Sequence, residues 1–173
     1  MSKILVSLFS ATGTTRKVAE EICKVENGDL YEIVPETPYT KQDLDYTVKD
    51  SRSNVEMADE SSRPAFVKKC DSIADYDTVF VGFPVWWGRE PSIIDTFLEA
   101  YDFSGKTIIP FLSHGGYGPA GTLASIEKAA PGADVEKNVL ALAGGREMNS
   151  ARQAVSNWLR ELRQIRQARS ARA

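Results

Sequence analysis

The chain alternates short apolar runs with segments of helical character along almost its whole length. The apolar runs, which we interpret as strands, lie at 3–9, 30–34, 78–83, 106–112 and 135–142. The helical segments that follow them lie at 13–25, 64–72, 91–100, 121–130 and 149–165. Continuously apolar runs are typical of strands in a parallel sheet, because helices cover both faces of such a sheet. The alternation therefore predicts an α/β fold with a doubly wound, five-stranded parallel sheet and helices on both faces.

The length of 173 residues is that of one domain, which we place at 1–165 and which a basic tail follows at 166–173. Residues 160–173 hold five arginines and one glutamate, a net charge of +4, whereas the whole chain has a formal charge of −3. The remaining body is therefore acidic, which argues against nucleic acid as a partner. No apolar run approaches the ~20 residues of a membrane span, and no signal cleavage site follows the first run. We expect a cytoplasmic protein without a membrane span.

Side chains suited to metal or thiol chemistry are few. Cys23 and Cys70 form neither a CxxC pair nor a metal-ligand spacing, so we expect two buried or half-buried thiols and no metal site. His114 is the single histidine, which excludes any mechanism that needs a histidine pair.

The loop after the first strand is rich in hydroxyl groups. Its four hydroxyl residues surround one glycine, and a helix begins at once, so side-chain hydroxyls and free helix N–H groups come together. A helix cap would explain only one of these hydroxyls. The pattern GxxxxGK[ST] is absent, which favours one terminal phosphate over a triphosphate. We therefore predict a phosphate site formed by Ser10, Ala11, Thr12, Gly13, Thr14 and Thr15.

The loop after the third strand contains two adjacent tryptophans. At the rim of a sheet, such indoles form either a platform that stacks against a flat ring or a hydrophobic plug, and a neighbouring phosphate loop favours the platform. Ligands bind at the carboxyl ends of the strands in an open parallel sheet, where this loop lies. The candidate ring-binding residues are Pro84, Val85, Trp86, Trp87 and Gly88.

The loop after the fourth strand is rich in glycine. Residues 116–121 match GxGxxG, but the acidic residues Asp134 and Glu136 lie at the start of the next strand and not at its end, where a dinucleotide site needs one. We therefore interpret the loop as a turn whose amides face the edge of a ligand. His114 is either an exposed loop residue or a proton donor beside that ligand. The candidate residues are Ser113, His114, Gly115, Gly116, Tyr117 and Gly118.

Residues 35–62 are polar and show no sustained periodicity. A segment of this length without clear elements is often a functional loop or a lid. A solvated insertion with a short helical turn fits the pattern equally well.

Together, the three loops resemble those of the flavodoxin family, and the resemblance extends over residues 3–165. Residues 10–15 resemble its (T/S)-x-T-G-x-T phosphate loop, residues 84–88 the loop against the flavin ring in a bacterial subgroup, and residues 113–118 the loop at the pyrimidine edge of that ring. The segment 35–62 is also similar to that subgroup. The resemblance implies the flavodoxin-like strand order 2-1-3-4-5, FMN as the cofactor, and the residues of all three loops as its binding site.

The resemblance implies electron transfer or other flavin-dependent redox chemistry. In that case FMN does the chemistry, and His114 is the one candidate for a proton donor. One alternative is an NAD(P)H-dependent quinone or azo reductase, and another is a non-redox, flavin-binding regulatory module. The expected partner is a redox protein for a carrier, or NAD(P)H and a quinone-type molecule for a reductase. We expect a monomer or a homodimer.

Overall fold

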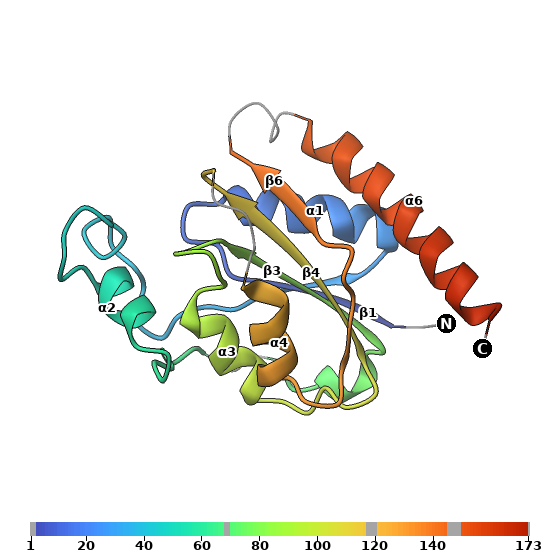
Figure 1. Cartoon of the computed structure of the whole chain (residues 1–173), viewed down its shortest axis with the longest axis horizontal. Coiled ribbons are helices and arrows are strands. Elements are labelled where there is room, and N and C mark those ends of the chain that lie inside the picture. Colours follow the sequence, from blue (N-terminus) through green and yellow to red (C-terminus); the bar gives the residue numbers. More distant parts are fainter. Residues whose placement is uncertain (1–2, 68–69, 117–120, 145–149, 173) are drawn as a thin grey trace.

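The core of the molecule is one parallel sheet, as Figure 1 shows. A computed structural model describes residues 3–67, 70–116, 121–144 and 150–172. The strands run in the order β2-β1-β3-β4-β5, β6 also pairs with β4, and all of these pairings are parallel. The predicted fold class and strand order are thus confirmed. The strands are β1 (Ile4–Leu8), β2 (Asp29–Glu32), β3 (Thr78–Pro84), β4 (Thr107–His114), β5 (Asp134–Val135) and β6 (Leu140–Ala143).

Helices cover both faces of this sheet. On one face, α1 (Thr14–Glu26) and α6 (Ala151–Ser170) bury an apolar cluster that includes Ile22, Trp158 and Phe80. On the other face, α3 (Ser92–Glu99) and α4 (Thr122–Ala129) bury a second cluster that includes Phe97 and Ile126. Because each strand contributes alternate side chains to the two clusters, both faces are dry, as the continuously apolar strands predict.

The fifth predicted strand is divided into two. β5 and β6 both pair with β4, but residues 136–139 between them belong to neither strand. At this break, Glu136 is 2% exposed, and its Oε1 accepts the N–H groups of Lys137 (2.8 Å) and Asn138 (3.0 Å). Arg169 of α6 donates to both carboxylate oxygens of Glu136. A carboxylate held this way turns the chain, so the prediction of one continuous strand over 135–142 is wrong.

The helix predicted at 64–72 is also wrong for the part that the structure describes. Phe66 forms an antiparallel bridge with Pro35, and the N–H of Val67 donates to Val34 O at 2.9 Å. Only Ile73–Asp75 forms a short 3-10 helix, and residues 68–69 lie outside the described residues. Backbone pairing with the chain after β2 therefore overrides the helical periodicity.

The last helix is longer than predicted, since α6 continues to Ser170 and includes most of the tail placed at 166–173. Two of its arginines pair with acids elsewhere: Arg163 with Glu26, and Arg169 with Glu136. Cys23 and Cys70 are free and half-buried, as expected.

Residues 35–62, here called the excursion, lie beyond the edge of the sheet, at the left of Figure 1. The excursion consists of turns and one short helix, α2 (Arg52–Ala58), which agrees with an insertion that contains a helical turn. In the part of the chain that the structure describes, no helix is long and apolar enough to cross a membrane.

Candidate functional site

The three candidate loops meet at one edge of the sheet. The register aligns Leu8 of β1 with Gly82 of β3, and Pro84 at the end of β3 with Ser113 of β4. Side-chain and backbone hydrogen bonds then join the loops directly. The hydroxyls of Thr15 and Ser113 lie 2.9 Å apart, and the N–H of Val85 donates to Ser113 O at 2.8 Å. Ser113 therefore connects the loops that follow all three strands.

In the first loop, two of the four hydroxyls maintain the structure of the loop itself. Ser10 Oγ accepts the N–H groups of Gly13 (3.0 Å) and Arg16 (3.4 Å), which closes the turn before α1. Thr15 is 1% exposed and is held by Ser113. These two side chains therefore help to fix the conformation of the loop before α1.

The other two hydroxyls of the first loop are accessible. Thr12 is exposed, Thr14 is half-buried, and their oxygens lie 3.5 Å apart. Gly13 has a φ of 88°, a left-handed conformation that suits glycine and that turns the chain into α1. The first N–H groups of a helix have no carbonyl partner within the helix, so the start of α1 offers donors to an anion. Ala11 follows Ser10 in the same loop and is half-buried.

The second loop is a tight hairpin, Trp86–Arg89. Trp86 and Arg89 exchange two backbone hydrogen bonds, at 2.9 and 3.2 Å. The two central residues, Trp87 and Gly88, have φ values of 49° and 81°. Positive φ at both positions is the geometry of a type I′ turn, and it is unusual for a bulky residue such as tryptophan.

The hairpin gives its two indoles different environments. Trp86 packs edge-on against Phe9 (ring centroids 5.6 Å apart) and Tyr39 (5.5 Å). Trp87, in contrast, is 53% exposed. The two interpretations of the paired tryptophans thus apply to different residues, with Trp86 as the plug and Trp87 as the exposed ring. Pro84 and Val85 are half-buried at the end of β3.

In the third loop, the described glycines are exposed. Gly115 and Gly116 face solvent, and Gly116 has a φ of 125°. His114 is half-buried, and its Nδ1 accepts the N–H of Gly116 at 3.2 Å, so the neutral ring carries its proton on Nε2. Tyr117 and Gly118 lie outside the described residues, as does most of the GxGxxG pattern.

Sequence reasoning missed a charged cluster behind the hairpin. Glu90 is fully buried, and neither of its carboxylate oxygens makes a hydrogen bond of normal geometry, although the hydroxyl of Ser125 is close enough to lower its pKa. Arg89 lies 3.5 Å from Glu90 and 3.0 Å from the buried Asp95. Burial raises the pKa of Glu90 to about 7, and the charge of Asp95 adds to the shift against the opposing effects of Ser125 and Arg89. Burial also raises the pKa of Asp95.

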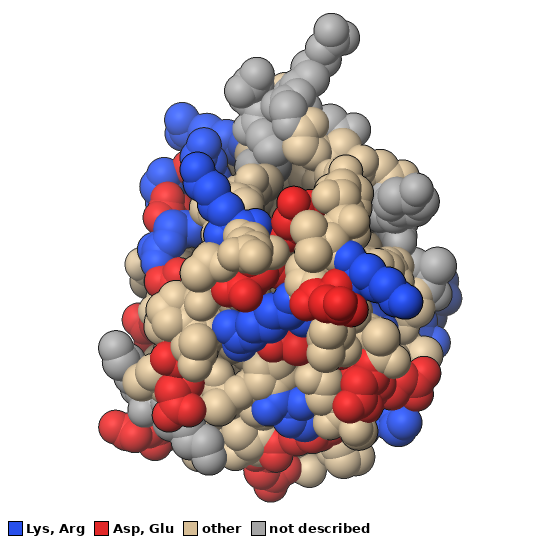
Figure 2. Space-filling view, turned by 90° about the vertical axis from the view of Figure 1, so that its left-hand side faces the viewer, with Lys and Arg blue, Asp and Glu red and all other residues tan. Residues whose placement is uncertain are grey.

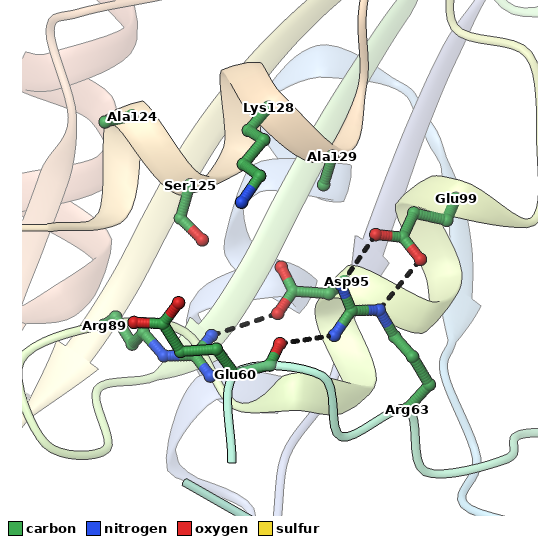
Figure 3. A pocket seen from close by; sticks show the side chains of 9 residues that line it. All are labelled: Glu60, Arg63, Arg89, Asp95, Glu99, Ala124, Ser125, Lys128 and Ala129. Atoms are coloured by element: carbon green, nitrogen blue, oxygen red, sulfur yellow. Dashed lines mark hydrogen bonds and ion pairs between the residues drawn. The ribbon is translucent and has the colours of Figure 1, made fainter. Parts of the chain in front are cut away.

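A pocket of about 310 Å³ adjoins this cluster, between α3, α4 and the end of the excursion. In Figure 3, Ser125 and Lys128 extend from α4 toward Asp95, while Arg63 is turned toward Glu99. The lining of the pocket combines three cationic side chains with three anionic ones. Among the described residues, no group of three or more His, Cys, Asp or Glu side chains is arranged to hold a metal ion. The lining residues are Glu60, Arg63, Arg89, Asp95, Glu99, Ala124, Ser125, Lys128 and Ala129.

The chain matches the family described as flavodoxin over residues 3–162. It is 42% identical to a protein assigned as a flavoprotein from Bacteroides uniformis, with a TM-score of 0.84 over 92% of this chain and 98% of that one. A second such protein, from Bacteroides eggerthii, is 39% identical, with a TM-score of 0.78 over 92% of this chain and 99% of that one. The flavoprotein from Lactobacillus acidophilus, solved in complex with FMN, is 22% identical, with a TM-score of 0.66 over 87% and 98%. No curated protein matches the chain.

Proposed function

Because the chain belongs to the flavodoxin family, we propose that it binds FMN at the carboxyl edge of its sheet and acts as a flavin-dependent redox protein. One observation carries the proposal. A loop with accessible hydroxyls at the start of α1 and an exposed indole meet at the edge where the ends of β1, β3 and β4 converge. The FMN complex of the relative from Lactobacillus acidophilus supports the choice of ligand.

The groups of the first loop fit a phosphate monoester. Thr12 and Thr14 offer accessible hydroxyls, and the start of α1 offers backbone N–H donors with a favourable dipole. A Cβ added at Gly13 would meet no atom within 4 Å, so space remains above the backbone for phosphate oxygens. These groups would hold the phosphate without a metal ion or a lysine.

The second and third loops fit a flat, partly polar ring. Trp87 offers an indole face, and stacking on aromatic rings is worth about 0.5–1.5 kcal/mol beyond buried area. A Cβ added at Gly88, Gly115 or Gly116 would meet no atom within 4 Å, so the backbone is open to a ligand at all three positions. Amides at these positions would orient the polar edge of the ring. His114 Nε2 would be the candidate proton donor beside it.

FMN, when bound, would accept and donate the electrons, so the role of the protein is binding, orientation and the exclusion of water. The ring of Trp86 supports the hairpin from behind and keeps solvent from the core at this edge. The aromatic side chains of the hairpin would disfavour a net negative charge on a ring bound against them.

A second candidate function is that of an NAD(P)H-dependent quinone reductase. Figure 2 views the end of the molecule that carries the excursion, and acidic and basic side chains are interspersed on it. Electrostatic steering of a protein partner uses a surface of one dominant sign, which this face lacks. A small-molecule donor and acceptor would not need such a surface.

The proposal is tested by reconstituting the purified chain with FMN, removing unbound flavin, and measuring flavin absorbance at a known protein concentration. We expect a stoichiometric yellow complex. Rapid mixing with NADPH then separates the candidates, because a reductase bleaches its flavin directly and turns over a quinone, whereas a carrier reacts only through a redox protein. A chain that takes up no FMN would refute the proposal.

A further inference from the structure

Tyr39 of the excursion packs against the residue before the phosphate loop and against the ring-binding hairpin. Its ring lies 5.6 Å from that of Phe9, the residue directly before the phosphate loop, with an interplanar angle of 58°. It also lies 5.5 Å from the ring of Trp86, at 78°. Phe9 and Trp86 themselves are in edge-to-face contact. The three rings thus form a closed triangle between the end of β1 and the hairpin.

Two charged residues of α2 hold Tyr39 in place from the other side. Its hydroxyl donates to Glu56 Oε2 at 2.6 Å, and the guanidinium of Arg52 lies 3.9 Å from the centre of its ring. Arg52 also donates to Glu56 Oε1 at 2.6 Å and to Thr37 O at 2.7 Å. Burial and the hydrogen bond to Glu56 raise the pKa of Tyr39, so its hydroxyl keeps its proton and remains a donor.

A second path leads from the same residues back to the hairpin. Ser92 Oγ donates to the backbone oxygen of Glu56 at 3.4 Å and accepts from Arg89 Nη2 at 3.3 Å. The excursion is therefore attached to both ends of the hairpin, at Trp86 through Tyr39 and at Arg89 through Ser92. Between these ends lie Trp87 and Gly88, the residues with positive φ.

We propose that Tyr39 is a positioning residue of the FMN site, which sets the ring-binding hairpin relative to the phosphate loop. This inference rests on the proposed function, since it assigns a role within that site. The hairpin conformation is costly, because a tryptophan at positive φ persists only where the surrounding structure enforces it. The packing of Tyr39 and Phe9 against Trp86 holds the hairpin in this conformation. The excursion is in this view a support for the site, and not a detached insertion.

The test compares Tyr39→Leu, which removes the ring and the hydroxyl, with Tyr39→Phe, which removes only the hydroxyl. Tyr46→Leu is the matched control, because Tyr46 lies in the same excursion but is 75% exposed. Affinities for FMN and for riboflavin are measured by fluorescence titration. In Tyr39→Leu we expect both affinities to fall about tenfold. The ratio of the FMN affinity to the riboflavin affinity measures what the phosphate contributes to binding, and we expect it to stay unchanged. Tyr39→Phe should lose about threefold, because one charge-assisted hydrogen bond is removed.

Two further measurements separate positioning from general loss of stability. At saturating FMN, the reduction potential of the bound flavin should shift in Tyr39→Leu and remain at the wild-type value in Tyr46→Leu. In the absence of flavin, amide hydrogen exchange of residues 86–89 should accelerate in Tyr39→Leu only. This second measurement keeps the inference testable even if the chain does not bind FMN. An unchanged potential with unchanged exchange in the hairpin would overturn the proposal.

Discussion

Replacement of Glu90 by glutamine should stabilise the protein above neutral pH. Glu90 is fully buried beside Arg89 and Asp95, and the effects of Arg89 and of the Ser125 hydroxyl, which favour its charged form, are smaller than the effect of burial. Burial raises its pKa from the ordinary value of 4.5 to about 7. Between these values the unfolded chain loses the proton while the folded protein keeps it, so the free energy of unfolding falls as the pH rises. The penalty is absent below the lower value and complete above the higher one.

The size of the effect follows from the shift. A difference of one pKa unit corresponds to about 1.36 kcal/mol, so the shift of Glu90 costs the wild type about 3 kcal/mol at high pH. Most of this cost, about 2.5 kcal/mol, develops between about pH 5 and about pH 8. Glutamine has nearly the shape of the protonated acid and carries no charge, so in the variant the free energy of unfolding does not fall with pH at this position. Burial also raises the pKa of Asp95, which interacts with Glu90.

Urea unfolding of the wild type and of Glu90→Gln at a series of pH values between about 5 and 8 checks this. The difference in unfolding free energy should grow with pH by about 2.5 kcal/mol in favour of the variant. Glu60→Gln is the control, since it makes the same substitution at an exposed residue that lines the neighbouring pocket. A flat difference for Glu90→Gln would mean that the buried carboxyl has a partner that stabilises its charge.

Four other substitutions have distinct expected effects. Gly82→Ala should lower the free energy of unfolding in urea by about 1–3 kcal/mol, because its Cβ would lie 2.0 Å from the ring of Phe111. Gly115→Ala, whose Cβ would meet no atom within 4 Å, should change the free energy of unfolding by no more than about 0.5 kcal/mol. Gly13→Ala should cost about 1 kcal/mol, because φ is 88° there; an unchanged melting temperature would contradict this. Trp87→Ala should change the free energy of unfolding by no more than about 0.5 kcal/mol but weaken riboflavin binding about threefold to tenfold. Equal riboflavin affinities of the variant and the wild type would show that the exposed indole does not stack against the flavin ring.

Much of the fold is predictable because it depends on patterns of local burial. Strands such as Thr78–Pro84 are buried on both faces, and their apolar runs indicate this directly. The predictions that are wrong involve distant contacts. The bridge between Phe66 and Pro35 replaces an apparent helix, and the ion pair between Glu136 and Arg169 marks the break between β5 and β6. Neither pairing leaves a periodic signal in the sequence.

In the candidate site too, the sequence predicts what depends on strand order but not what depends on contacts between distant residues. The order of strand, loop and helix predicts that the three loops share one edge, since parallel strands place their carboxyl ends together. It does not predict that Thr15 is used internally, because its partner Ser113 is distant in sequence. Tyr39 and Glu90 were missed for a similar reason. Tyr39 lies in a segment without periodicity, and Glu90 is a glutamate, a residue type that is almost never fully buried unless it is paired.

The account depends most on the first loop, where hydroxyls and helix N–H groups are expected to hold a phosphate. Isothermal titration of the same protein with FMN and with riboflavin, which lacks only the phosphate, tests this directly. We expect FMN to bind at least about a hundredfold more tightly, since charge-assisted hydrogen bonds contribute about 1.5–3 kcal/mol each. Double replacement of Thr12 and Thr14 by valine should reduce that ratio and leave riboflavin binding unchanged. Equal affinities for the two flavins in the wild type would contradict the account.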